Sequence, residues 1–246
     1  MRKQDPGRVG AVNWTELSVP PSIGISNALN PVFMTQSVLS DAVAALALPQ
    51  PRINSEISVE HCLLKRRSVR SFRNAALSLA DISQLLWAAQ GIAAEGHLRT
   101  APSAGALYPL EVYLVAGNVD GLEPGGYHYR PGRHELVLIK AGDFRRELDR
   151  AALGQDYVAN GAAIILFAAV YARTSAKYGQ RATRYVHFEA GHAAQNVCLQ
   201  ATALGLGAVT VGAFEDDEVK RVVALMDSCE PVYLMPIGPM PVARKQ

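Results

Sequence analysis

An arginine-rich segment is the first part of the chain whose residue types and spacing could do chemistry. Arg66, Arg67, Ser68 and Arg70 lie within five residues. Each guanidinium group offers a fork of charge-assisted donors, so together they can hold a phosphate dianion. The alternative is a solvated basic helix end, because cations are favourable beside the negative end of the helix dipole. This segment alone leaves both interpretations open.

A stretch of small side chains follows at residues 102–109, which read Pro-Ser-Ala-Gly-Ala-Leu-Tyr-Pro. Small residues let a backbone approach a flat ring system closely, and a proline at each end stiffens the stretch. The alternative interpretation is an ordinary connection between a helix and a strand.

A lysine and a tyrosine, Lys177 and Tyr178, are adjacent in a polar segment between a buried strand and a long helix. Both can exchange protons once their pKa values shift, so they could form an acid/base pair. An exposed loop pair is the alternative. His187 and His192 are five apart on the long helix and point about 140° from each other, which disfavours a shared metal. Core packing or interface hydrogen bonding suits these two histidines better.

The glycines at positions 205, 207 and 212 suggest a nucleotide loop only superficially. A dinucleotide-binding fingerprint follows a strand and opens a helix, with Gly-x-Gly-x-x-Gly spacing. Here the glycines follow a helix and open a strand, with four residues between the second and third. The sequence has no Walker A pattern either. A bound nucleotide would therefore need some other scaffold.

The hydrophobic pattern predicts the elements that position these residues. Ser58 can cap a first helix, and Ser78 with Asp81 has the spacing of a capping box for a second, which Gly91 can end. Further helices are expected over residues 143–153 and 185–204 and after the acidic run at 215–218. Strands are expected at residues 110–114, 127–130, 135–139, 162–170, 208–213 and 231–237. The predicted fold class is α+β, with a mixed central sheet surrounded by helices.

Composition narrows the class of protein. Hydrophobic residues make up 49% and charged residues 19% of the 246, which supports a substantial core, and a net charge of +2 gives no sign of nucleic-acid binding. Three separated cysteines (Cys62, Cys198 and Cys229) predict reduced, buried thiols and no thiolate metal site. No apolar run is long enough to span a membrane and no export signal is evident, so a cytoplasmic location is expected.

Two parts of the chain differ in character. Residues 1–56 carry six prolines without sustained periodicity, and we interpret them as a proline-rich N-terminal extension that is either mobile or wrapped around the body. Residues 57–246 are expected to form the compact domain.

The order and spacing of these segments resemble the nitroreductase superfamily. The blocks that carry the resemblance are Arg-Arg-Ser-x-Arg, Leu-Leu-Trp-Ala-Ala-Gln-Gly (85–91) and residues 102–109. Gly-Gly-Tyr-His-Tyr (125–129), Glu-Ala-Gly-His-Ala-Ala-Gln-Asn (189–196) and Ala-Leu-Gly-Leu-Gly (203–207) resemble its SagB-type dehydrogenase branch more narrowly. Together these six blocks cover about residues 57–240.

The resemblance implies a nitroreductase-like fold, an intertwined homodimer and FMN at each of two subunit interfaces. It assigns the arginine-rich segment to the phosphate and pyrimidine side of the flavin, and residues 102–109 to a loop donated across the dimer. Many nitroreductases carry Glu-Gly where this chain has Gly212-Ala213, so contacts there would come from backbone. The implied FMN-binding residues are Arg66, Arg67, Ser68, Arg70, Pro102, Ser103, Ala104, Gly105, Leu107, Val211, Gly212, Ala213 and Arg244, with Lys245 as second choice to Arg244.

The resemblance also implies the chemistry. SagB-like enzymes of peptide modification oxidise azoline rings, and a Lys-Tyr pair linked to proton removal matches Lys177 and Tyr178. The expected function is therefore two-electron transfer between FMN and a small organic or peptide-borne heterocycle. One alternative is a nitroreductase or quinone reductase that takes electrons from NAD(P)H. Another is a non-catalytic flavin-binding protein.

Overall fold

The computed structural model describes residues 45–94 and 98–241. Its centre is a seven-stranded sheet in the order β1-β8-β7-β5-β9-β11-β10. The strands of this sheet are β1 (Ala45–Ala47), β5 (Leu110–Ala116), β7 (Gly125–Arg130), β8 (Glu135–Ala141), β9 (Ala163–Ala169), β10 (Leu206–Ala208) and β11 (Glu230–Pro239). Short pairs are formed by β2 (Leu77–Ser78) with β6 (Val119–Asp120) and by β3 (Ile92–Ala94) with β4 (Leu98–Arg99).

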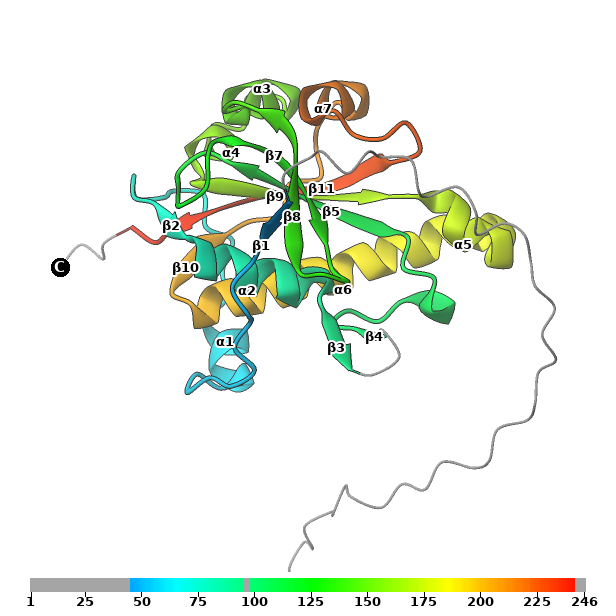
Figure 1. Ribbon diagram of the computed structural model, residues 1–246, viewed down its shortest axis with the longest axis horizontal. Helices are drawn as coiled ribbons and strands as arrows, with labels where there is room; N and C mark the ends of the chain where they lie inside the picture. Colours follow the sequence, from blue (N-terminus) through cyan, green and yellow to red (C-terminus); the bar gives the residue numbers. More distant parts are fainter. Residues whose placement is uncertain (1–44, 95–97, 242–246) are drawn as a thin grey trace, which may run out of the picture. The chain divides into compact units, whose positions relative to one another are not determined.

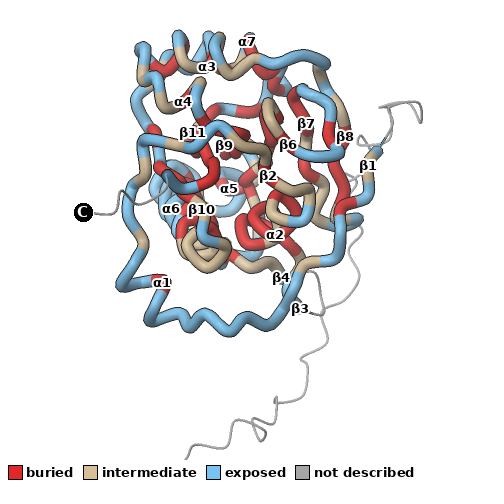
Figure 2. Tube along the Cα trace, turned by 90° about the vertical axis from the view of Figure 1, so that its left-hand side faces the viewer, coloured by how far each residue is buried: buried red, intermediate tan, exposed pale blue. Residues whose placement is uncertain are grey.

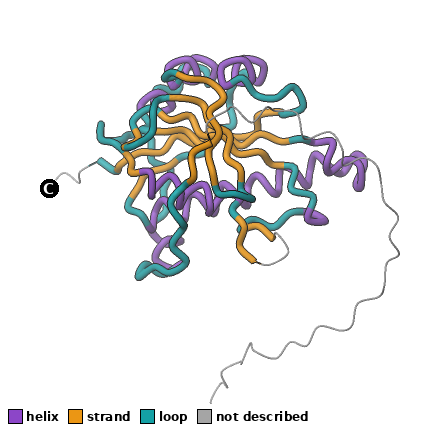
Figure 3. The backbone as a smooth tube through the Cα atoms, in the orientation of Figure 1, coloured by secondary structure: helices purple, strands orange, loops and turns teal. Residues whose placement is uncertain are grey.

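Helices cover both faces of the sheet (Figures 1 and 3). The helices α2 and α6 lie on one face, and α3, α4 and α7 lie on the other. The helices are α1 (Val59–Lys65), α2 (Leu79–Gln90), α3 (Arg145–Ala151), α4 (Tyr157–Asn160), α5 (Tyr171–Tyr178), α6 (Ala182–Ala203) and α7 (Asp216–Val223). Short 3-10 turns occur at Ala104–Ala106 and Gly179–Arg181.

The central strands are buried on both faces because side chains alternate across a sheet. In β9, Ile165 and Phe167 pack toward α2 and α6, whereas Ile164 and Leu166 pack toward α3 and α7. The expected α+β fold with a helix-covered sheet is confirmed. The strand pairings of the large sheet are antiparallel throughout, so the central sheet is antiparallel and not mixed. Among the described residues, parallel pairing occurs in the short pair β2 and β6 and at an isolated bridge between Ser68 and Ala208.

Local signals placed most elements correctly. The Ser78 hydroxyl accepts a hydrogen bond from the Asp81 amide, and the Asp81 carboxylate accepts one from the Ser78 amide, which confirms the capping box of α2. The expected strand over 208–213 is wrong. Strand β10 ends at Ala208, and beyond it only Val211 pairs, through a bridge to Leu234. Strand β1 comes from the stretch that we interpreted as the N-terminal extension.

The helix α1 buries little of its surface. Only Cys62 is buried, while Val59, Leu63 and Leu64 are exposed. Figure 2 shows α1 almost entirely in the colour of exposed residues. Cys198 and Cys229 are buried as well, as expected. No helix in residues 45–94 and 98–241 is long and apolar enough to cross a membrane.

Candidate functional site

The candidate residues gather into two groups. We call residues 98–109, the Lys177-Tyr178 pair and Glu189 the loop group. Residues 66–70, 155–157 and 206–213 form the arginine group. The first lies toward the N-terminal end of α6, beside α5, and the second toward its C-terminal end, beside β10 (Figure 1).

The loop and the Lys-Tyr pair meet at Gly105. A Cβ atom at this position would stand 2.8 Å from Tyr178 Oη and 3.0 Å from Lys177 Nζ. Only a glycine leaves room for that approach, and its φ of +67° also favours glycine. The pair belongs to the last turn of α5, so the alternative interpretation as a loop pair is wrong. Lys177 is exposed, and its Nζ lies 5.5 Å from the centroid of the Tyr178 ring.

The loop itself is strained. Ala106 and Tyr108 have positive φ values of 53° and 47°, next to Gly105. A left-handed conformation costs a residue with a Cβ about 1–2 kcal/mol. The Ser103 hydroxyl helps to hold this turn by accepting a hydrogen bond from the Tyr108 amide at 2.9 Å. Strain of this kind collects at functional sites, where surrounding contacts maintain it.

A buried carboxylate supports the start of the loop. Glu189 on α6 is 3% exposed, accepts a hydrogen bond from Gln90 Nε2 at 3.5 Å and lies close to Ser103. Burial raises the pKa of this carboxyl to about 7, against the opposing influence of Ser103, the Arg99 charge and Gln90. The Arg99 guanidinium donates to Gln90 Oε1 at 2.9 Å and lies 4.5 Å from the centroid of the Tyr108 ring. Sequence analysis treated Glu189 and Gln90 only as parts of motifs and missed Arg99.

The arginine-rich segment lies against β10. The Val69 amide donates to the Ala208 carbonyl at 3.0 Å, and a Cβ at Gly207 would stand 2.6 Å from Val69 Cγ1. Arg67 Nη1 donates to the carbonyls of Leu64 and Arg66 at 3.0 and 2.7 Å. Arg67 therefore satisfies carbonyl groups at the end of α1. For this residue the structure agrees with the alternative interpretation, in which the segment is a basic helix end.

Arg66 and Arg70 are left available to an anion. Neither forms an ion pair within the part of the chain that the structure describes, and the neighbouring Ser68 is exposed. Arg66 lies near Cys198, whose pKa is raised by burial against the influence of the Arg66 charge. The Arg70 guanidinium lies 5.7 Å from the centroid of the Tyr157 ring. This donor set has the chemistry that a phosphate group requires.

Residues 211–213 join the same group through α4. Val211 is buried, whereas Gly212 and Ala213 are exposed. The Ala213 carbonyl accepts a hydrogen bond from Gln155 Nε2 at 2.9 Å, and Tyr157 Oη donates to Gln155 Oε1. Gln155 and Tyr157 thus connect residues 211–213 with Arg70. Sequence analysis missed both residues because no motif marks this short helix.

The two groups stay apart within one chain. Glu189 and Cys198, which meet the loop group and Arg66 respectively, are nine residues apart on α6, or about 14 Å along its axis. No hydrogen bond or ion pair between described residues joins residues 66–70 to residues 98–109. Arg244 and Lys245 lie outside the described residues. A site built from both groups would need the loop group of one chain to meet the arginine group of another.

The remaining polar candidates behave differently from expectation. His187 and His192 are both exposed, so core packing is the wrong interpretation for them. His187 Nε2 lies 2.8 Å from Tyr171 Oη on α5. Within the described part of the chain, no three His, Cys, Asp or Glu residues are placed to hold a metal ion.

Fold and candidate site together define an α+β protein with a cationic, arginine-rich end and a strained small-residue loop. The model of the Nitroreductase family matches residues 63–239, and the chain belongs to this family.

Individual relatives agree with this assignment. A candidate nitroreductase of Methanocaldococcus jannaschii is 46% identical over 183 residues, covering 74% of this chain and 91% of the relative. The microcin B17-processing protein of Escherichia coli is 29% identical over 160 residues, covering 61% of this chain and 57% of the relative. The crystal structure of a candidate nitroreductase from Ralstonia eutropha superposes with a TM-score of 0.71 at 30% identity, covering 80% of this chain and 90% of that one.

Proposed function

We propose that the protein is an FMN-dependent oxidoreductase of the SagB dehydrogenase type that oxidises an azoline-like ring on a small molecule or peptide. The observation that carries this proposal is the contact between the Lys177-Tyr178 pair and Gly105. It brings two proton-transfer groups to the small-residue loop that the family resemblance assigns to the flavin. The similarity to a microcin B17-processing protein supports a substrate of peptide origin.

The arginine group would hold the cofactor. Arg66 and Arg70 would pair with the FMN phosphate, and Ser68 would donate a hydrogen bond to it. Arg67 would add its charge while it satisfies the end of α1. Residues 211–213, together with Arg244, complete the proposed set, with Gly212 and Ala213 offering backbone contacts. Bound FMN would supply the two-electron chemistry by accepting a hydride.

The loop group would handle the proton. Either Tyr178 Oη or Lys177 Nζ would accept a ring proton from the substrate, as a general base must lie within hydrogen-bond reach of the proton it removes. Pro102, Ser103, Ala104, Gly105 and Leu107 would face the flavin through small side chains and backbone.

A homodimer would bring the loop group of one protomer onto the arginine group of its partner. The exposed apolar side chains of Val59, Leu63 and Leu64 on α1 support association, because apolar patches on a surface mark interaction sites. The separation of the two groups along α6 supports it as well.

The first test is the absorbance of the purified protein, which should show bound flavin or take up added FMN. The second test uses Lys177→Ala with Tyr178→Phe and a synthetic thiazoline-containing peptide as substrate. Oxidation should fall at least about a hundredfold, because general acid–base catalysis contributes that much. Tyr171→Phe on the same helix is the control and should stay active. Undiminished oxidation by the double variant would rule the proposal out.

A second candidate is a nitroreductase or quinone reductase that takes electrons from NAD(P)H. The 46% identity to a candidate nitroreductase favours it. Stopped-flow mixing of the flavin-loaded protein with NADPH separates the two functions. Rapid bleaching of the flavin by NADPH would favour the reductase. The rate of bleaching should then be the same in the wild type and in the Lys177→Ala, Tyr178→Phe variant.

A further inference from the structure

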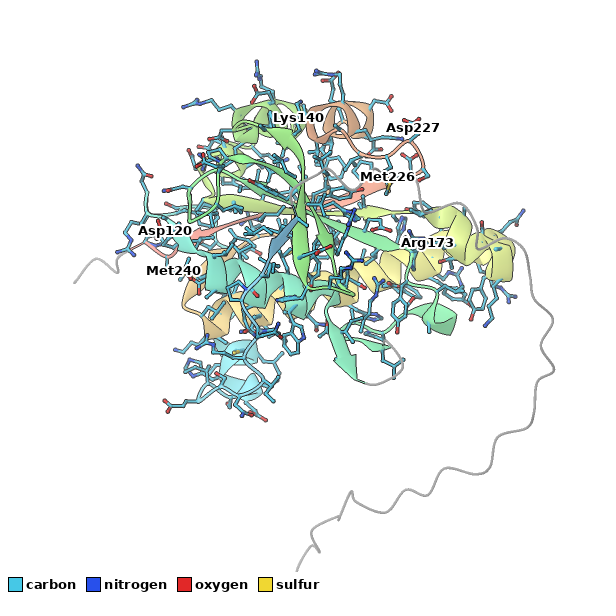
Figure 4. The ribbon with its side chains drawn as sticks, viewed as in Figure 1. Asp120, Lys140, Arg173, Met226, Asp227 and Met240 are labelled. Atoms are coloured by element: carbon cyan, nitrogen blue, oxygen red, sulfur yellow. The ribbon has the colours of Figure 1, made fainter. Side chains whose placement is uncertain are left out.

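The end of the loop opposite Glu189 is held by a second carboxylate, that of the partly buried Glu111, which acts through an arginine. Arg173 lies on α5, one helical turn before Lys177. Its Nη1 donates to the Tyr108 carbonyl at 3.0 Å, and its Nη2 pairs with Glu111 Oε1 on β5. Figure 4 shows Arg173 beside α5, at the edge of the sheet.

The Glu111 side chain is itself anchored to the sheet. Its Oε2 lies 2.7 Å from His128 Nε2 on β7, and the side chains of Glu111 and His128 are 13% and 23% exposed. The ring of His128 packs against Tyr113 with centroids 4.9 Å apart. Two adjacent central strands therefore fix the carboxylate that receives Arg173.

Arg173 consequently ties together three parts of the site. Its side chain joins α5 to the sheet and to Tyr108, the last residue of the loop with a positive φ, and the Val170 amide adds a hydrogen bond to the Pro109 carbonyl at 2.8 Å. The Tyr108 amide also donates a hydrogen bond to the Ser103 hydroxyl. Any shift of Arg173 would move the Tyr108 carbonyl and α5, and therefore the contact of Gly105 with Lys177 and Tyr178.

We propose that Arg173, oriented by Glu111, is a positioning residue that sets the Lys177-Tyr178 pair against the 102–109 loop. The inference rests on the proposed function, since it explains how the proposed proton-transfer groups are placed. A guanidinium group suits this role because its fork reaches two acceptors at once. A lysine keeps the charge but presents a single point of donation.

Arg173→Lys is therefore the decisive variant. The matched control is Arg145→Lys, because Arg145 likewise spans a carboxylate, Asp143, and a backbone carbonyl, that of Gly161 at 2.6 Å, on the opposite face of the sheet. Hydrogen–deuterium exchange on the full chain reads the loop directly. Exchange of the Ala106 and Tyr108 amides should be about tenfold faster in Arg173→Lys and unchanged in Arg145→Lys.

Turnover of the thiazoline-containing peptide gives the second readout. Arg173→Lys should lower kcat by about tenfold to a hundredfold, with KM and FMN affinity little changed, because misplacement of catalytic groups acts on the chemical step. Glu111→Gln should act in the same direction. In a Lys177→Ala, Tyr178→Phe background, Arg173→Lys should cause no further loss.

The outcomes separate this inference from the proposed function. Full turnover by the Lys177→Ala, Tyr178→Phe variant would overturn the proposed function, while loop exchange would still report on Arg173. Unchanged loop exchange in both Arg173→Lys and Glu111→Gln would overturn the positioning role, even if the Lys-Tyr pair proved essential. Equal effects of Arg173→Lys and Arg145→Lys on loop exchange would mean that Arg173 has only a general structural role. That result would also overturn the positioning role.

Discussion

The loop group and the arginine group differ in how far the protein fixes their geometry by itself. In the loop group, Ser103 and Arg173 hold the strained backbone near Tyr108, with the buried Glu189 behind the first and the partly buried Glu111 behind the second. In the arginine group, Arg66 and Arg70 meet no carboxylate among the described residues. The first group has the preorganisation that catalytic geometry requires. The second has charge that a bound anion would satisfy.

The largest expected effect tests whether Arg66 and Arg70 bind the FMN phosphate. Replacing Arg66 and Arg70 together with alanine removes two charge-assisted interactions, each worth about 1.5–3 kcal/mol. The affinity for FMN should fall at least a hundredfold, measured by titration of the flavin absorbance. Arg150→Ala, which removes an exposed cation on α3, is the control. Unchanged FMN affinity in the double variant would mean that the arginine group does not bind the phosphate.

The pH dependence of stability tests the loop group through its buried carboxylate, Glu189. The pKa of Glu189 is raised by burial to about 7 from an ordinary value near 4.5, so the folded state keeps this proton after the unfolded state has lost it. The stabilisation is complete below about pH 4.5 and is lost as the pH rises to about 7. The loss is at most about 1.4 kcal/mol for each pH unit.

Glu189→Gln removes this titration and provides the reference. The free energy of unfolding of the wild type, relative to this variant, should fall between pH 4.5 and 7 and stay constant above. Glu218→Gln is the control, because the exposed Glu218 has a pKa lowered by its hydrogen bond with Arg221 and cannot produce a loss with rising pH. A difference that does not change with pH would show that Glu189 is not held in a desolvated state.

A smaller effect is expected where the arginine-rich segment lies on β10. A Cβ at Gly207 would collide with Val69, so Gly207→Ala should displace residues 66–70. Overpacking of this kind costs about 1–3 kcal/mol, and it should appear as weaker FMN binding. Gly191→Ala is the matched control, because nothing lies within 4 Å of its added methyl group. Equal FMN affinity in the two variants would contradict the assigned contact.

The smallest expected effect is a loss of stability that leaves both groups unchanged. Ser78→Ala removes the capping box of α2, which should lower the free energy of unfolding by about 1 kcal/mol. Thermal unfolding measures this change, while loop exchange and FMN affinity should remain as in the wild type. A change in either would show that α2 couples to the two groups more tightly than its packing suggests.

Local signals in the sequence predicted the elements well where one interaction dominates. Ser58 and Ser78 cap their helices, and the apolar run at residues 162–170 is the buried strand β9. The prediction failed where tertiary contacts decide. Residues 209–213 have a strand-like composition, yet the segment meets β11 only through one bridge at Val211 and one backbone hydrogen bond from Val209. Lys177 and Tyr178 lie in a polar stretch, yet they belong to a helix that Arg173 fastens to the sheet.

The sequence by itself determined the fold class, the family resemblance and the candidate residues, because these depend on residue types, caps and spacing along the chain. Only the tertiary structure decided which candidates meet. Gly105 and Tyr178 are 73 positions apart, and their approach depends on the hydrogen bonds that join Tyr108 to Ser103 and to Arg173, which no local pattern encodes. The same folding leaves Arg66 and Arg70 open, because no acidic side chain of the described residues reaches them.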